Sequence, residues 1–217
     1  MRFARTALAT GELLAPDGAA WQALAAEQIV MVPTPLRANR AIARVSPFLA
    51  QSTDHGRIGA LELRGAHNGV VLALRLEWQC ERHDRIADLD RFVDGVAVMF
   101  PLAAGASAVS MGAPGAPVEA WYWRADHADR VFEVIAEGYG TSARRAADAS
   151  PLRAAAAHRA GRWCVVLARA LEAGERRARL QPGSVARLAF AVWDGGNRER
   201  AGRKAFSGEF MPAELAP

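Results

Sequence analysis

Lys204 is the only lysine in a chain that carries 26 arginines, which makes it the first candidate for chemistry that a guanidinium cannot perform. Both side chains are cations in water, but a lysine amine loses its proton when it is desolvated, whereas a guanidinium stays charged. The free amine offers a lone pair that can attack a carbonyl, act as a base or bind a metal. The alternative is that one lysine has been retained by chance on a solvated loop.

Met111 is the second candidate, because its thioether lies in Ser110-Met111-Gly112, between a loop of small residues and a Gly/Pro-rich turn. Core packing is the ordinary role of a methionine, but the edge of a turn is an unusual place for that role. Met99 is a rival thioether, although it lies inside an apolar strand and is more simply a core residue. A thioether and a neutral amine on opposite sides would suit a six-coordinate, low-spin haem iron in a dry cavity with aromatic and aliphatic walls.

The sequence lacks the motifs of common enzyme active sites. It has no GxSxG elbow, no HExxH pair, no CxxC and no glycine-rich phosphate loop before a helix. Asp88 and Asp90 belong to a charged loop and are interpreted as solvated carboxylates. The histidines lie in polar or turn-like stretches and are predicted to be surface residues: His55, His67, His83, His127 and His158. A stand-alone hydrolase or transferase is therefore the least favoured function.

The composition is that of one globular domain covering residues 1–217, with 51% hydrophobic residues and a net charge of +4. Acidic and basic side chains are interleaved without a block of five like charges, so nucleic acid is not an expected partner. No apolar run is long enough for a membrane-spanning helix. Gly11, Glu12 and Pro16 interrupt the N-terminal stretch before the apolar run of an export signal forms. Cys80 and Cys164 are expected to be buried thiols, with a disulfide left open.

Period-two alternation is the strongest local pattern. The stretch 70–78 alternates apolar residues with Arg75 and Glu77, as a strand with one solvated edge or face does, and the Asn68-Gly69 turn before it predicts a hairpin with 61–64. Further strands are predicted at 29–32, 92–100, 118–124, 163–171 and 185–193. A helix interrupted at Pro151 is expected within 142–158, while 129–136 fits either state. Many short strands and few helices indicate a mainly β protein, an antiparallel β-sandwich with a few short helices.

A series of short motifs runs along most of the chain, and its order and spacing are more specific than any single member. The motifs are Asp17–Trp21, Asp94–Pro101, Met111-Gly112, Val118–Trp123, Gly138–Thr141, Gly161–Val166, Val192–Gly195 and Arg203–Ser207. The series resembles the haem b-binding gamma subunits of the ethylbenzene dehydrogenase and dimethylsulfide dehydrogenase group of molybdenum enzymes.

This resemblance implies a β-sandwich that holds one non-covalent haem b between a methionine and a lysine. The matching positions are Met111 and Lys204, the two residues that their chemistry had already singled out. Members of the group work in heterotrimers, beside a molybdopterin catalytic alpha subunit and an iron–sulfur beta subunit. They pass electrons to an external acceptor such as cytochrome c. The expected role is therefore electron transfer, without catalysis by this subunit alone.

Two features depart from the family pattern. Met99 stands where a polar residue, usually glutamine, is expected, and no export signal is visible, so a cytoplasmic location competes with the periplasmic one that the resemblance implies. The absence of CxxCH agrees with haem b. The competing function is a haem-free carbohydrate- or ligand-binding β-sandwich, in which exposed Trp121, Trp123 and Trp193 would stack on sugars. A haem-free subunit that only docks to partners is the third interpretation.

Overall fold

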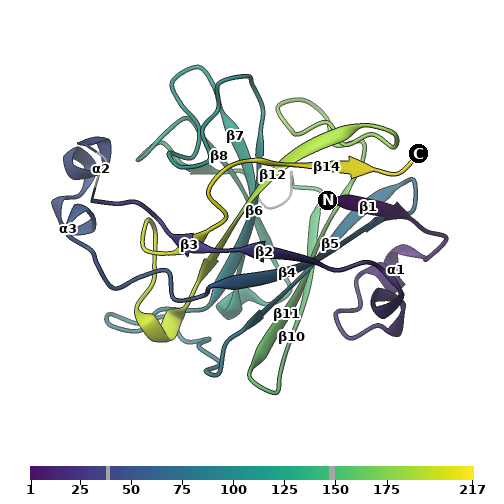
Figure 1. The fold of residues 1–217 in the computed structure, drawn as a ribbon, viewed down its shortest axis with the longest axis horizontal. Helices are drawn as coiled ribbons and strands as arrows, with labels where there is room; N and C mark the ends of the chain where they lie inside the picture. Colours follow the sequence, from purple (N-terminus) through teal and green to yellow (C-terminus); the bar gives the residue numbers. More distant parts are fainter. Residues whose placement is uncertain (38–39, 147–149) are drawn as a thin grey trace.

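The computed structural model describes residues 1–37, 40–146 and 150–217, which form many strands and a few short helices (Figure 1). The strands are β1 (Arg2–Arg5), β2 (Glu27–Val30), β3 (Val32–Pro33), β4 (Ala60–His67), β5 (Val71–Gln79), β6 (Gly95–Pro101), β7 (Val118–Arg124), β8 (Val131–Ala136), β9 (Ala143–Arg144), β10 (Leu152–Arg159), β11 (Arg162–Ala170), β12 (Val185–Trp193), β13 (Ala205–Phe206) and β14 (Met211–Leu215). The α-helices are α1 (Thr10–Leu13), α2 (Arg40–Val45) and α3 (Pro47–Ala50), and the 3-10 helices are η1 (Ala19–Ala23), η2 (Ala125–His127) and η4 (Gly195–Asn197).

The strands form an antiparallel β-sandwich, as predicted. The first sheet has the order β10-β11-β5-β4, with β2 along β4, and the second has the order β12-β6-β7-β8-β9, with β13 along β12. β1 and β14 pair in parallel with each other and link β4 to β12, so one hydrogen-bond ladder continues from sheet to sheet. This pairing places the two chain ends side by side (Figure 1).

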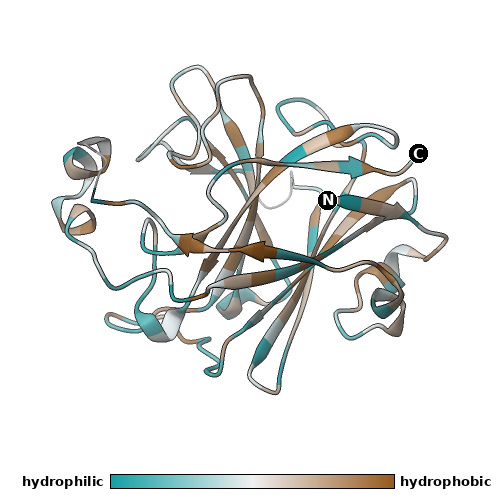
Figure 2. Cartoon of the chain, viewed as in Figure 1, coloured by the Kyte–Doolittle hydropathy of each residue, from teal (hydrophilic) through white to brown (hydrophobic). Residues whose placement is uncertain are grey.

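The core between the sheets is built by the alternation that the sequence displays. Leu72, Leu74, Leu76 and Trp78 of β5 are all buried in it, together with residues of β6, β7, β11 and β12. Aromatic rings meet across the two sheets, since the ring centroids of Trp123 and Trp163 lie 4.9 Å apart. Figure 2 shows the corresponding pattern, with apolar colour on the strands and hydrophilic colour on many loops.

The opposite face of the first sheet is covered, and the prediction of a solvated face there was wrong. Leu13 and Trp21, from the N-terminal helices, pack against Ala73 and other small residues of β5 and β11. Arg75 points to this side but is only 5% exposed, and its Nε donates to Pro16 O at 2.9 Å. The polar residues of β5 therefore mark a sheet face that the N-terminal segment covers.

The helix predicted within 142–158 was also wrong in the residues that the structure describes, and 147–149 lie outside them. Residues 143–144 form β9, and Leu152–Arg159 form β10, which pairs with β11 along its whole length. Alanine and arginine favour helices only weakly, by tenths of a kcal/mol per residue, and a complete ladder of backbone hydrogen bonds outweighs that preference. The ambiguous stretch 129–136 contains β8.

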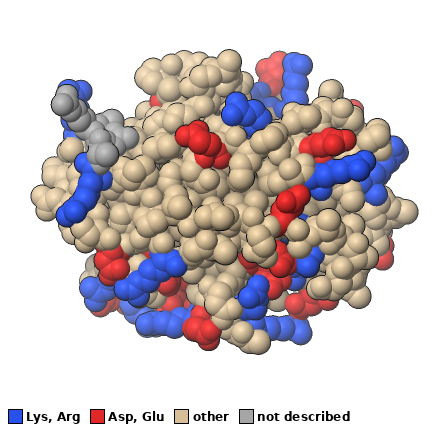
Figure 3. Space-filling view, viewed as in Figure 1, with Lys and Arg blue, Asp and Glu red and all other residues tan. Residues whose placement is uncertain are grey.

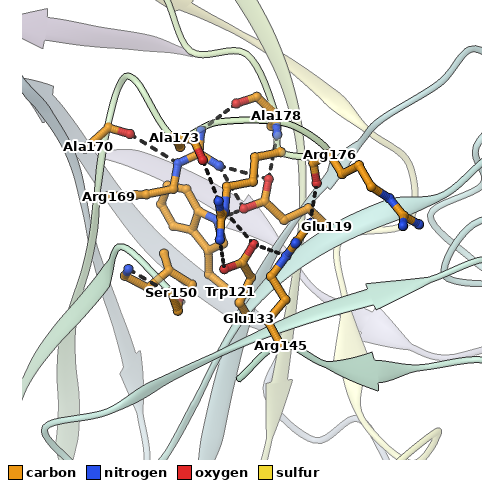
Figure 4. Close-up of polar contacts among 12 residues, drawn as sticks. Glu119, Trp121, Glu133, Arg145, Ser150, Arg169, Ala170, Ala173, Arg176 and Ala178 are labelled. Atoms are coloured by element: carbon orange, nitrogen blue, oxygen red, sulfur yellow. Dashed lines mark hydrogen bonds and ion pairs between the residues drawn. The ribbon is translucent and has the colours of Figure 1, made fainter. Parts of the chain in front are cut away.

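A buried ion network joins the two sheets at one end of the sandwich (Figure 4). Arg169 of β11 donates from Nη1 to both carboxylate oxygens of Glu119 of β7, at 2.8 and 2.9 Å. Beside this pair, Arg145 and Arg177 both bind Glu133 of β8, at 2.6 and 2.8 Å. The network therefore fixes the region around β9, because Arg145 directly follows that strand.

Outside this network the surface charges are mixed. Figure 3 shows basic and acidic side chains next to each other on the face in view, around a broad uncharged middle. No helix within the described residues is both long enough and apolar enough to cross a bilayer. The free thiols of Cys80 and Cys164 are buried, as expected.

Replacing Glu119 by glutamine will lower the free energy of unfolding by about 3 kcal/mol or more, because it leaves the buried Arg169 guanidinium without its counter-charge. Urea denaturation followed by tryptophan fluorescence measures this loss. The matched control is Arg57→Gln, which removes an exposed ion pair with Asp54 and costs about 0.5 kcal/mol or less. Equal effects of the two substitutions would contradict the importance given to the buried network.

Candidate functional site

A cavity of about 590 Å³ lies on the outer face of the second sheet. This volume is within the range of about 300–1,000 Å³ that is usual for small-molecule and cofactor pockets. The sequence suggested aromatic and aliphatic walls but did not indicate which face of which sheet they would line. The core between the sheets is instead filled by side chains.

The sheet provides a floor of mostly small side chains. Ala97 of β6 pairs with Ala191 of β12 on one side and with Tyr122 of β7 on the other, and Ala120 of β7 pairs with Val134 of β8. All of these except Ala191 line the main cavity, and Ala191 lines a narrow extension beneath it. Because side chains alternate along a strand, the bulky partners of these alanines point into the core and leave the outer face open.

Loops from distant parts of the sequence form the walls of this cavity. Leu36, Ile42 and Leu49 come from the segment that carries α2 and α3, and Phe92 and Val93 precede β6. The remaining wall comes from segments 109–111, 138–144 and 199–204, which overlap three of the sequence motifs. Apolar side chains dominate the set, so the cavity is suited to an apolar molecule with a few polar attachment points.

Lys204 points into this cavity from the residue before β13. Its Nζ donates to Met111 Sδ at 3.8 Å and lies 5.0 Å from the centroid of the Trp193 ring. The residue is only 9% exposed, and desolvation by burial lowers the pKa of its amine from 10.5 to about 8. Within residues 1–37, 40–146 and 150–217, no carboxylate forms an ion pair with it. The protonated amine of Lys204 has three N–H donors, and the neighbours given above are one sulfur atom, Met111 Sδ, and one aromatic ring, that of Trp193.

Met111 is held in a backbone conformation that its side chain does not favour. Its φ of 58° lies in the left-handed region, at a cost of about 1–2 kcal/mol for a residue with a Cβ. Gly112 follows with a φ of 92°, and a Cβ there would lie 2.7 Å from Ala136 O. Gly138 N donates to Met111 O at 3.0 Å, and Gly112 N donates to Ser107 O at 2.8 Å. These contacts turn the thioether toward Lys204.

A chain of hydrogen bonds fixes the backbone of Lys204 from the other side. Thr34 donates to Lys204 O from both its N and its Oγ1, each at 3.1 Å. His55 Nε2 donates to Thr34 O at 2.8 Å, and its Nδ1 lies 3.0 Å from Ser52 Oγ. Arg203 donates from Nη1 to Ser52 Oγ at 2.9 Å, which closes the chain. Sequence reasoning missed these positioning residues, since nothing in the spacing of residues 34, 52 and 55 indicates this contact.

Several sequence predictions need correction at this point. The carbohydrate-binding alternative required exposed Trp121, Trp123 and Trp193, but Trp121 and Trp123 are buried between the sheets, and of the three only Trp193 lines the cavity. The sugar-stacking interpretation thus loses two of its three tryptophans. His55 and His67, predicted to be surface residues, are buried and bind backbone carbonyls. The local sequence around a histidine does not distinguish a surface side chain from one that bridges two backbone segments.

Met99, the rival thioether, lies beneath the main cavity. It does not line that cavity, but it lines the narrow extension together with Met111 and Lys204. It packs beside Ala189 and Phe210 in a small apolar cluster. Met111 alone combines contact with the Lys204 amine and access to the cavity, so the geometry favours it over Met99.

Known proteins share the sequence pattern of this chain. The sequence matches the family model described as ethylbenzene dehydrogenase over residues 18–151 and 145–205. The chain therefore belongs to this family, and the resemblance to the gamma subunits of this group is confirmed.

Three relatives with assigned names illustrate the family. The chain is 32% identical over 195 residues to the respiratory nitrate reductase heme subunit ORF7, as it is named, of Haloferax mediterranei, with 88% of this chain and 65% of that protein covered. It is 37% identical over 142 residues to the chlorate reductase subunit gamma of Ideonella dechloratans (64% and 58% covered). It is 31% identical over 152 residues to the dimethylsulfide dehydrogenase subunit gamma of Rhodovulum sulfidophilum (66% and 56% covered). The chain thus spans less than two thirds of the length of each relative.

Solved structures with the same architecture are similar in fold alone. A family 9 carbohydrate binding module from Caldicellulosiruptor kristjanssonii, in complex with glucose, has a TM-score of 0.51 at 10% identity and covers 99% of this chain and 95% of its own. A protein from Bacteroides uniformis, described as carbohydrate-binding, has a TM-score of 0.55 at 9% identity, with 99% and 98% covered. Function does not follow from likeness of this kind.

The buried amine predicts a specific pH dependence of stability in the ligand-free protein. Below pH 8 both the folded and the unfolded chain carry the proton, and the folded state bears the full desolvation cost. Between pH 8 and pH 10.5 the folded chain loses the proton first, so stability from this group rises with pH, by about 3 kcal/mol in all. The measurement is urea denaturation of wild type and Lys204→Met across pH 7–10.

The difference between these two proteins isolates Lys204, because the pKa of the Cys164 thiol, raised to about 12 by burial, affects both equally. Wild type will gain stability relative to the variant as pH rises. A difference that is independent of pH would show that the amine is not desolvated.

Proposed function

We propose that this chain is an electron-transfer subunit that binds one non-covalent haem b, with Met111 and Lys204 as the two axial ligands of the iron. The observation that carries the proposal is the 3.8 Å contact between Nζ and Sδ in an apolar cavity. The family membership and the heme subunit named among the relatives support it.

The donor set fits a haem. Lys204 Nζ and Met111 Sδ would hold the iron, since a neutral amine and a neutral thioether are both donors that iron accepts. The two atoms lie 3.8 Å apart at the same apolar cavity. Their long, unbranched side chains could adjust to the metal by rotation.

The environment of Lys204 prepares its amine to act as a ligand. A free lysine would need about 4–5 kcal/mol to lose its proton at pH 7. With a pKa of about 8, that cost falls to about 1–2 kcal/mol. Burial by the loops around Thr34 and Ile42 thus supplies most of the required shift before any ligand is present.

When bound, the haem iron supplies a one-electron redox centre, and the protein tunes its potential. Met111 contributes a neutral, soft sulfur, which stabilises the reduced metal and raises the potential. The apolar walls, including Leu36, Leu49 and Val134, keep water from the two ligating atoms. The chain itself performs no bond chemistry on a substrate.

The family resemblance supplies the partners of this proposal. A molybdopterin catalytic alpha subunit and an iron–sulfur beta subunit deliver electrons to this chain, and an acceptor such as cytochrome c receives them. The relatives named as gamma subunits support a role inside such an assembly. A periplasmic location accompanies this role, and cell fractionation distinguishes it from the cytoplasmic alternative.

Lys204→Arg is the sharpest test of the nitrogen ligand, because a guanidinium remains protonated and cannot bind iron. Wild type reconstituted with haemin will show a six-coordinate, low-spin absorption spectrum, with a sharp α-band after dithionite reduction. The variant will give a high-spin spectrum or take up no haem. An unchanged low-spin spectrum in the variant would refute the assignment.

Met111→Leu tests the sulfur ligand with little change in side-chain volume. Loss of the thioether will lower the midpoint potential, or abolish haem binding, in a spectroelectrochemical titration. Met99→Leu is the matched control and will leave both spectrum and potential unchanged. The reverse result, with only the Met99 variant altered, would transfer the role to Met99.

A further inference from the structure

The described residues around the cavity carry more positive than negative charge at its rim. Arg124, Arg144 and Arg200 line it, whereas Glu199 is the only carboxylate among its described lining residues. Glu199 is buried and already committed, because Oε1 accepts from Gly56 N at 2.6 Å and Oε2 accepts from Asp194 N at 3.1 Å. It therefore neutralises none of the three guanidinium groups by direct contact.

The three arginines differ in their partners. Arg124 forms a bidentate ion pair with Asp126, at 3.0 and 2.7 Å. The Arg144 guanidinium instead lies over the ring of Phe132, at 4.3 Å from its centroid, and that of Arg200 lies over Phe92, at 4.6 Å. Neither forms an ion pair within the described part of the chain. Two exposed cations are thus held on aromatic rings at the cavity, with no counter-charge among residues 1–37, 40–146 and 150–217.

Arg144 lies away from the ligand pair along the sheet, and Arg200 lies over Phe92, close in sequence to Gly95, which pairs with Arg124. Ala120 of β7 lines the narrow extension together with Met111 and Lys204. Phe132, which carries the Arg144 guanidinium, pairs with Tyr122, two residues further along β7, and Arg124 lies two residues beyond that. At about 3.3 Å per residue, the sheet extends about 13 Å from Ala120 to Arg124. A flat molecule held at its centre by the ligand pair can therefore direct one edge toward the arginines.

We propose, on the basis of the haem site proposed above, that Arg144 and Arg200 form a carboxylate subsite that binds the two propionates of the porphyrin. A guanidinium matches a carboxylate in geometry and can donate two parallel hydrogen bonds to it. Stacking on Phe132 and Phe92 restricts both side chains in advance, so less freedom is lost when the anion binds. The subsite also selects the orientation of the ring, since only one edge of the porphyrin carries carboxylates.

The test compares haemin with haemin dimethyl ester, in which both propionates are uncharged. Wild type, Arg144→Gln, Arg200→Gln and the double variant are loaded with each compound, and the rate of transfer to excess apomyoglobin is measured. Arg153→Gln, at an exposed arginine of β10, is the matched control. Each single variant will release haemin about tenfold faster than wild type, as expected for one charge-assisted contact at a partly exposed site. The ester will leave all proteins at one common rate.

Two further readouts separate this proposal from the axial assignment. The double variant will keep a low-spin spectrum, because both ligands are intact, but its midpoint potential will fall as positive charge is removed near the iron. Equal haemin release from wild type and double variant, or a larger effect of Arg124→Gln, overturns the carboxylate subsite alone. Failure of wild type to form a low-spin haemin complex overturns both proposals.

Discussion

The arrangement of the candidate site depends on one desolvated amine, that of Lys204. Lys204 is buried beside a thioether and an indole ring, with no carboxylate paired to it in the described parts of the chain. Such a charge is costly to bury, and its proton is correspondingly easy to remove. The surrounding elements maintain this situation. β13 pairs with β12 and brings Lys204 beside Trp193, Thr34 fixes its carbonyl, and the left-handed turn at Met111 directs the sulfur toward it. The amine is therefore desolvated in the ligand-free protein, which is the condition that the proposed metal ligation needs.

The two sheets of the sandwich are covered on their outer faces in different ways. On the first sheet, Leu13 and Trp21 pack closely on small residues such as Ala73. On the second sheet, alanines such as Ala97 and Ala120 form a low floor, and the loops span it at a distance. The core between the sheets supplies the stability, so the outer face of the second sheet is free to remain open. Packing between the sheets and the lining of the cavity thus involve opposite faces of β6, β7 and β12.

Arg144 and Arg145 are neighbours in the sequence, but their side chains contact different faces of the second sheet. Arg145 turns inward to Glu133 in the buried network, where every charge has a partner and fixes the end of the sandwich (Figure 4). Arg144, one residue earlier, lies over Phe132 on the cavity side, and no carboxylate within residues 1–37, 40–146 and 150–217 is paired to it. Because successive side chains of an extended backbone point to opposite faces, Arg145, just after β9, anchors the chain on one side, while Arg144 of β9 faces the cavity on the other. The paired network also holds Arg144 in position, since it fixes the backbone next to it.

The sequence by itself determined the strands with strong alternation, the sandwich class and the two candidate side chains. The period-two patterns predicted these strands correctly because each strand buries one face against the core. The composition made Lys204 stand out, and the turn context did the same for Met111. Only the tertiary structure decided that these residues, 93 positions apart, come into contact. It also decided that residues 152–159 form a strand, that Trp121 and Trp123 belong to the core, and that His55 supports the site. These features depend on hydrogen bonds and packing between segments that are distant in the sequence. The local sequence of one segment does not indicate which distant segment it will contact.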